Sequence, residues 1–88
     1  MVKRGKLDII KDILKIIQKH DSIKPTPLLR KSNISSGRFK EYFLDLLKKD
    51  FVKETYNNKE KFISLTEKGQ KFLEKYKTII SFIEEFEL

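Results

Sequence analysis

Two prolines, Pro25 and Pro27, constrain the fold of this chain more than any other feature, because no helix runs through them undisturbed. The residues before them repeat Leu and Ile at helical spacing, which predicts a first helix over KLDIIKDILKIIQKH. Thr26 followed by Pro27 is a typical helix start, with an N-cap oxygen before a proline at the first helical position. We therefore expect a second helix of about two turns from this point. Ile23, just before it, fits a short isolated strand.

The segment NISSGRFKEYFLDLLKKD, residues 33–50, predicts a third helix whose first turn is small, polar and cationic. Ser35 is a natural N-cap, and Ile34 can pack on Phe39 as a hydrophobic staple. Helical spacing predicts a buried face made of Phe39, Tyr42, Phe43, Leu46 and Leu47. A short helix, a tight turn and a longer helix with a polar start match the helix-turn-helix pattern, although an ordinary capped helix starts in the same way.

A β-hairpin is predicted next. Two runs rich in β-branched and aromatic residues, FVKETY and KFISL, flank Asn57 and Asn58, and asparagine tolerates the positive φ angles of a turn. The hairpin tip is expected to carry Lys59 and Lys61.

The C-terminal part of the chain predicts a long helix, capped by Thr66 and running to residue 87, which makes it about 33 Å long. Apolar residues recur in it at the spacing of a coiled-coil seam, and they are Phe72, Tyr76, Ile79, Ile83 and Phe86, with Ile80 beside them. The small domain before this helix cannot cover its whole length. Exposed Ile and Phe side chains near its end therefore indicate a partner.

The first helix carries two apolar rows, which begin at Leu7 and Ile9 and together cover about half of its circumference. Either it is a well-buried helix of a compact domain, or it packs against both its own core and a second subunit. A second copy that pairs through the final helix would give the second row a partner. We therefore expect a homodimer through the C-terminal helix and the first helix, rather than a monomer with a folded-back tail.

Length and composition restrict the class of protein. Eighty-eight residues allow one domain, and 39% hydrophobic residues argue against a disordered chain. No run approaches the roughly 20 apolar residues of a membrane span, so we expect no transmembrane segment or secretory signal and a cytoplasmic, nucleoid-associated protein. The chain has no Cys, one His (His20), no Gly-rich phosphate loop and no paired-carboxylate pocket. We expect no enzymatic activity, metal, cofactor or small-molecule ligand.

The net charge of +7 is unevenly distributed. Residues 1–50 contain 13 Lys/Arg and 6 Asp/Glu, a balance of +7, and residues 51–77 contain 7 and 4, a balance of +3. The last eleven residues, TIISFIEEFEL, contain no base and 3 acids. A basic body suits a polyanion, whereas the acidic and apolar tail suits a different partner.

The order of helix, short strand, helix, turn, helix, β-hairpin and long helix is that of a winged-helix domain. From KLDIIKDIL through SNISSGRFKEYFLDLL to LTEKGQKFLEKY, the chain resembles small archaeal winged helix-turn-helix DNA-binding proteins that dimerise through an antiparallel C-terminal coiled coil. The segment LTEKGQKFLEKY fits the family's L-T-x-x-G-x-x-F/L exit from the wing. The resemblance implies an α+β, mainly α fold with a winged-helix DNA-binding domain at residues 1–68 and a dimerisation helix at residues 66–88.

The resemblance also implies roles for individual residues. Those expected to contact DNA are Ser35, Ser36, Arg38, Lys40 and Tyr42 on the third helix, Thr26, Arg30 and Lys31 on the second, and Lys59 and Lys61 on the wing. Those expected to form the dimer are Phe72, Tyr76, Ile79, Ile80, Ile83 and Phe86. The implied function is binding of double-stranded DNA as a transcription regulator or a chromatin-type protein. The alternative is a winged-helix module for protein–protein interaction in a larger assembly.

Overall fold

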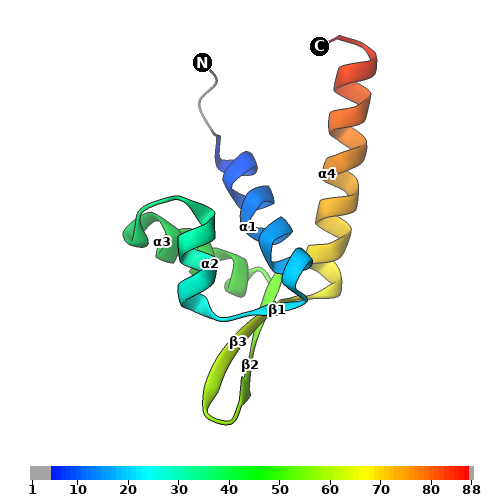
Figure 1. Cartoon of the computed structure of the whole chain (residues 1–88). Coiled ribbons are helices and arrows are strands. Elements are labelled where there is room, and N and C mark those ends of the chain that lie inside the picture. The colour runs from blue at the N-terminus through cyan, green and yellow to red at the C-terminus, as the bar shows by residue number, and fades with distance from the viewer. Residues whose placement is uncertain (1–4, 88) are drawn as a thin grey trace.

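The computed structural model describes residues 5–87 as a mainly helical chain with one small sheet (Figure 1). The elements in order are α1 (Lys6–His20), β1 (Ser22–Ile23), α2 (Pro25–Ser32), α3 (Ser36–Lys48), β2 (Val52–Asn57), β3 (Glu60–Leu65) and α4 (Glu67–Glu85). The three strands are antiparallel in the order β1-β3-β2. The predicted α+β architecture, with a long C-terminal helix, is confirmed.

The core forms around α1, which packs against α2, the sheet and α4. Ile13, Leu14 and Ile17 have no exposed surface, and Ile9 is 2% exposed. Both apolar rows of α1 are therefore buried within the single chain, so the breadth of its apolar face does not require a second subunit. Leu7 is 60% exposed at the start of the helix, and Ile16 is half-buried against the core.

The connection between α1 and α2 differs from the prediction in two ways. Ile23 is not in an isolated strand, because it pairs with Ile63 of β3. Thr26 is not the N-cap of α2: the cap is Lys24 and the helix begins at Pro25. A residue before proline is held extended, so Lys24 adopts the non-helical conformation of a cap (φ −74°, ψ 153°) and Pro25 takes the first helical position.

The predicted cap of α3 is confirmed, because the Ser35 side chain accepts a hydrogen bond from the backbone N–H of Arg38 at 3.3 Å. The β2–β3 hairpin is also confirmed, but its two turn residues are Asn58 and Lys59, with φ angles of 52° and 67°. Positive φ at both positions matches the twist of the strands in a two-residue turn. Lys59 therefore lies at the tip, whereas Lys61 lies within β3.

The start of α4 is fixed onto the turn between α3 and β2. Thr66 caps α4 by accepting from the N–H of Gly69 at 3.1 Å, and its hydroxyl donates to the carbonyl of Asp50 at 2.5 Å. Gly69 is buried against the chain at Phe51, and a Cβ at position 69 would overlap the backbone oxygen of Phe51. The L-T-x-x-G segment thus provides both the Thr66 cap and the close contact of Gly69 with Phe51. Together these two contacts set the direction in which α4 leaves the domain.

The C-terminal half of α4 extends away from the other elements, as Figure 1 shows. Leu73 is buried, but Ile79, Phe82 and Phe86 are each more than 55% exposed. The helix ends at Glu85, two residues before the predicted end. The predicted exposure of Ile and Phe near the C-terminus is confirmed for the single chain.

Replacing Gly69 with Ala is expected to destabilise the fold, because the added methyl group must displace the Phe51 carbonyl. We expect a loss of about 1–3 kcal/mol in the free energy of unfolding, measured by chemical denaturation. Gly37→Ala is the matched control, since a Cβ there would meet nothing within 4 Å. An equal effect of the two substitutions on stability would contradict a special role for the Gly69 contact.

Candidate nucleic-acid interface

The first turn of α3 is an open, polar helix start. Ser35, Ser36, Gly37 and Arg38 are all exposed. The free backbone N–H groups and the positive end of the helix dipole make such a start a site for anions. Gly37 has open space where a Cβ would lie, so the fold does not require glycine at this position.

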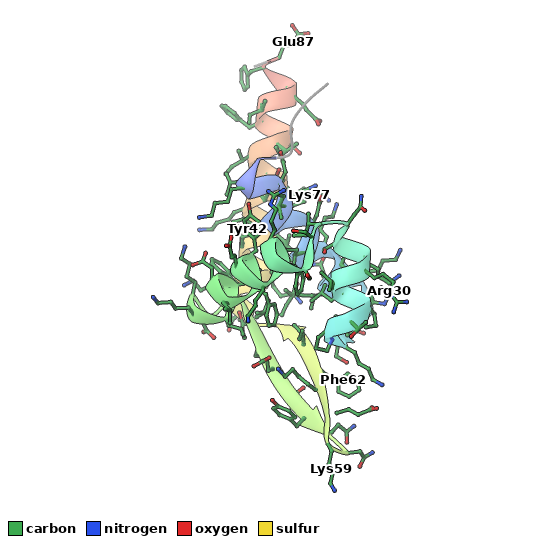
Figure 2. The ribbon with its side chains drawn as sticks, turned by 90° about the vertical axis from the view of Figure 1, so that its left-hand side faces the viewer. Arg30, Tyr42, Lys59, Phe62, Lys77 and Glu87 are labelled. Carbon is green, nitrogen blue, oxygen red and sulfur yellow. The ribbon has the colours of Figure 1, made fainter. Side chains whose placement is uncertain are left out.

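Further along α3, the predicted residues separate into exposed and packed ones. Lys40 is exposed, as are Glu41 and Leu44, and Leu44 is 54% exposed. Tyr42 is half-buried and packs against the core. Figure 2 shows Tyr42 on the side of α3 that is distant from the hairpin tip with Lys59. Tyr42 lies one helical turn after Arg38, so the two side chains are neighbours on α3, with Tyr42 at the edge of the buried face.

Thr26, Arg30 and Lys31 on α2 are exposed, and α2 contacts α3. Arg30 lies on the outer flank of α2 in Figure 2. Arg30 and Lys31 thus add two exposed cations on the helix next to α3.

The charges on the hairpin are partly neutralised within the chain. Lys61 forms an ion pair with Glu54 at 2.8 Å, and Lys24 forms one with Glu60 at 3.0 Å. The hydrogen bond and the charge of Glu54 raise the pKa of Lys61. Lys61 is thus committed to Glu54 and is not at the tip where the sequence pattern predicted it.

The exposed aromatic residue of the hairpin was not predicted as a functional residue. Tyr56 is 69% exposed and pairs with Lys61 across the two strands, so these side chains share one face. Alternation along β2 could have identified it, since Tyr56 lies two residues after Glu54 and four after the buried Val52.

Several cations on α2, α3 and the hairpin form no ion pair within residues 5–87. They are Arg30, Lys31, Arg38, Lys40, Lys48, Lys53 and Lys59, and we call this set the open cationic surface. Every member is exposed. Of these, Lys48 and Lys53 were not predicted from the sequence. In Figure 1, α2 and α3 lie on the opposite side of α1 from α4, and the β2–β3 hairpin extends below the helices.

The predicted dimerisation residues on α4 fall into two groups. Phe72 makes an edge-to-face contact with Phe51, with ring centroids 5.5 Å apart, and the Tyr76 hydroxyl donates to Asp8 at 2.6 Å. These two residues therefore contact their own domain. The other four, Ile79, Ile80, Ile83 and Phe86, lie on the projecting half of α4. Phe82, which contacts Phe86 with centroids 4.7 Å apart, lies outside the seam spacing and was not predicted.

The part of the chain that the structure describes contains no group of three His, Asp or Glu side chains placed to hold a metal ion. Among residues 5–87, no helix is long and apolar enough to cross a membrane.

Residues 3–84 match the model of the winged helix-turn-helix family. The chain belongs to that family. The elements follow the winged helix-turn-helix order, in which α2 and α3 form the helix-turn-helix and the β2–β3 hairpin is the wing. The resemblance derived from the sequence is thereby confirmed at the level of family and fold.

Solved structures share this winged helix-turn-helix fold. Sso10a-2, a DNA-binding protein from Sulfolobus solfataricus, is 23% identical with a TM-score of 0.76, over 94% of this chain and 85% of that one. SSV1 F-93 is 28% identical with a TM-score of 0.70, over 89% and 91%. AF1382 from Archaeoglobus fulgidus is 20% identical with a TM-score of 0.69, over 91% of each chain. No curated protein matches the sequence.

The hydrogen bond from Tyr76 to Asp8 joins α4 to α1 and predicts a pH-dependent contribution to stability. Only the protonated phenol can donate this bond to the Asp8 carboxylate, and the bond raises the pKa of Tyr76 above its ordinary value of 10.0. The stabilisation is therefore present below pH 10 and is lost as the pH rises through the raised pKa. We expect Tyr76→Phe to lower the free energy of unfolding by about 0.5–1 kcal/mol at pH 7, since the pair lies near solvent.

Denaturant unfolding at pH 7 and at about pH 11 measures this effect, and the difference between wild type and Tyr76→Phe should shrink at the higher pH. Tyr56→Phe serves as the control, because Tyr56 is exposed and makes no such bond. A Tyr76→Phe deficit that stays constant across this range would show that the bond does not stabilise α4.

Proposed function

We propose that this protein binds double-stranded DNA as a homodimer, with α3 in the major groove and the wing tip on the neighbouring backbone or minor groove. The observation that carries the proposal is the open cationic surface, whose seven exposed side chains lie on α2, α3 and the hairpin, together with the exposed helix start of α3. Membership of the winged helix-turn-helix family supports it, as does the similarity in fold to the DNA-binding protein Sso10a-2.

The first turn of α3 has the groups that such a complex needs. Ser35 accepts from Arg38 N–H as a cap, and its own hydroxyl proton is free to donate to a phosphate. The exposed N–H groups near Ser36 and Gly37 suit a second phosphate. Arg38 is the residue best suited to a bidentate contact with a guanine edge, the commonest specific contact in the major groove.

The remaining polar and cationic side chains would position the protein rather than read bases. Thr26, Arg30 and Lys31 on α2 are placed to contact phosphates beside the groove that α3 enters. Lys59 at the wing tip would reach the adjacent backbone or minor groove. Lys61 contributes less than its sequence position suggested, because Glu54 already neutralises it.

The dimer would form through the exposed apolar residues of α4, leaving residues 1–68 as the DNA-binding domain and residues 66–88 as the dimerisation helix. A two-fold dimer places two α3 helices on one duplex, and successive major grooves on one side lie about 34 Å apart. The proposed role is that of a transcription regulator or an architectural, chromatin-type protein, located with the nucleoid in the cytoplasm.

One observation favours a second function, that of a protein-interaction module. Glu41 and the 54% exposed Leu44 lie on the open side of α3, where an acid repels phosphate and an apolar side chain suits a protein surface. Glu41 could instead accept from a cytosine amine, and Leu44 could contact a thymine methyl group.

Fluorescence anisotropy with a random-sequence duplex, titrated across salt, tests the proposed function. Wild type is expected to bind with an affinity that falls steeply with salt, by about 0.9 in log K per neutralised phosphate per decade of salt. Arg38→Ala is expected to bind at least about five-fold more weakly, because it removes a cation from the proposed contact surface. Lys71→Ala is the control, since Lys71 lies on α4, across α1 from α3 in Figure 1.

Three outcomes separate the possibilities. Weaker binding by Arg38→Ala alone supports α3 as the DNA-contacting helix. Equal affinities of all three proteins, with a steep salt dependence, would remove α3 from the interface and leave non-specific coating by other cations. Absence of binding by wild type even at low salt would refute DNA binding and favour the interaction module.

A further inference from the structure

The β2–β3 hairpin has two faces that differ in what covers them. Residues directly opposite each other in the ladder share a face, and so do side chains two residues apart on one strand. Val52 is 2% exposed and Ile63 has no exposed surface, because both belong to the core that includes residues of α1 and α3. Their face is therefore turned toward the helices. We call it the inner face, and it is made of Val52, Glu54, Tyr56, Lys61, Ile63 and Leu65.

Tyr56 extends the inner face beyond the core. It lies four residues after Val52 on the same strand, which is about 13 Å further along the hairpin. Tyr56 is 69% exposed, the largest exposed fraction of any large hydrophobic residue within 5–87. Its side chain makes no hydrogen bond and no ring contact with the described residues. The ring is therefore available to a partner.

The other aromatic residue of the hairpin is covered. Phe62 lies on the opposite, outer face, where it pairs with Thr55 across the strands. Phe62 is half-buried, and the ammonium of Lys24 lies 5.9 Å from its ring centroid. The outer face thus covers its aromatic ring within the chain, whereas the inner face leaves its ring open.

The charges beside Tyr56 cancel. Lys61, directly opposite Tyr56, forms an ion pair at 2.8 Å with Glu54, which lies two residues before Tyr56. An unpaired Glu54 would repel a phosphate near the ring. The unpaired cations of the hairpin lie elsewhere, Lys59 at the tip and Lys53 on the outer face. A partner that meets the inner face would therefore be held there by its apolar atoms rather than by its charge.

The proposed DNA complex brings such a partner to this face. With α3 in a major groove and the wing tip at the adjacent minor groove, the backbone that separates the two grooves lies between α3 and the hairpin. The hairpin extends below the helices in Figure 1, and the exposure of Tyr56 shows that no helix within residues 5–87 covers the inner face at this level. Deoxyribose rings are the apolar part of that backbone, and an uncharged aromatic ring packs well against them.

We infer that Tyr56 packs its ring against the deoxyribose rings of the strand that passes between α3 and the wing. The inference rests on the proposed function and adds to it a contact without charge. Sugar contacts carry no sequence information directly, so Tyr56 positions the wing rather than selecting a site. Its share of the affinity is not weakened by salt, because the burial of an aromatic ring releases no counterion.

Fluorescence anisotropy across salt separates this contact from a cationic one. Tyr56→Ala is expected to bind a random-sequence duplex at least about five-fold more weakly than wild type, because alanine cannot bury the same apolar surface. The slope of log K against log salt is expected to stay that of wild type, whereas Arg38→Ala, which removes a charge, is expected to reduce it. Tyr56→Phe keeps the ring and is expected to bind like wild type. Thr55→Ala is the matched control, since Thr55 is the exposed neighbour of Tyr56 on the outer face.

A tryptophan placed on either face locates the contact directly, because the chain has no native tryptophan. The emission of Tyr56→Trp is expected to shift to shorter wavelength when duplex is added, since the indole ring leaves water. The emission of Thr55→Trp is expected to stay unchanged under the same conditions.

The outcomes distinguish this inference from the proposed function. Duplex binding by Tyr56→Ala as tight as that of wild type would overturn the contact and leave the proposed function standing. An equal loss in Tyr56→Phe and Tyr56→Ala would make the hydroxyl the contacting group and overturn the packing on sugars. A spectral change in Thr55→Trp alone would put the outer face on the DNA. Absence of duplex binding by wild type would refute the proposed function, and the contact with it.

Discussion

The close approach of Gly69 to the backbone of Phe51 is the constraint on which the arrangement of this molecule depends. Phe51 follows α3 directly and precedes β2, so it is tied to the helix-turn-helix and to the wing at once. Gly69 brings the first turn of α4 against it, and the Thr66 cap fixes the same turn. One backbone contact therefore relates the direction of α4 to that of α3. In a dimer built on α4, this relation would set the separation of the two α3 helices.

The molecule also separates its charges from its exposed apolar surface. The open cationic surface lies on α2, α3 and the wing, whereas the exposed Ile and Phe side chains lie on the far half of α4. The acidic C-terminal residues are kept away from the cationic side. The 88-residue chain thus has one surface suited to a polyanion and another suited to an apolar helix. The two kinds of partner would not compete for the same residues.

Features that depend on neighbouring residues could be predicted from the sequence. The caps Ser35 and Thr66 and the helices they start were predicted, because a cap is a contact within four residues. The start of α2 was misplaced because both Pro25 and Pro27 suit a first helical position, and in the structure Lys24 is the cap. The pairing of Ile23 with Ile63 was missed because the two residues are distant in the sequence. The ion pair of Lys61 with Glu54 depends on the register of two strands. Phe72 and Ile79 occupy equivalent positions in the predicted seam. Only the fold shows that Phe51 packs against Phe72, whereas Ile79 is 57% exposed in the described chain. The candidate contact residues on α2 and α3 follow from the fold and the resemblance, and their roles await experiment.

The most direct test of the central claim is a map of backbone amide chemical shifts on addition of a short random-sequence duplex. The account predicts that the largest changes occur at Ser36, Gly37 and Arg38 on α3 and at Lys59 on the wing, with little change at Lys71 and Lys75 on α4. Shifts concentrated on α4, with α3 and the wing unaffected, would contradict the claim that the open cationic surface is the DNA-binding face.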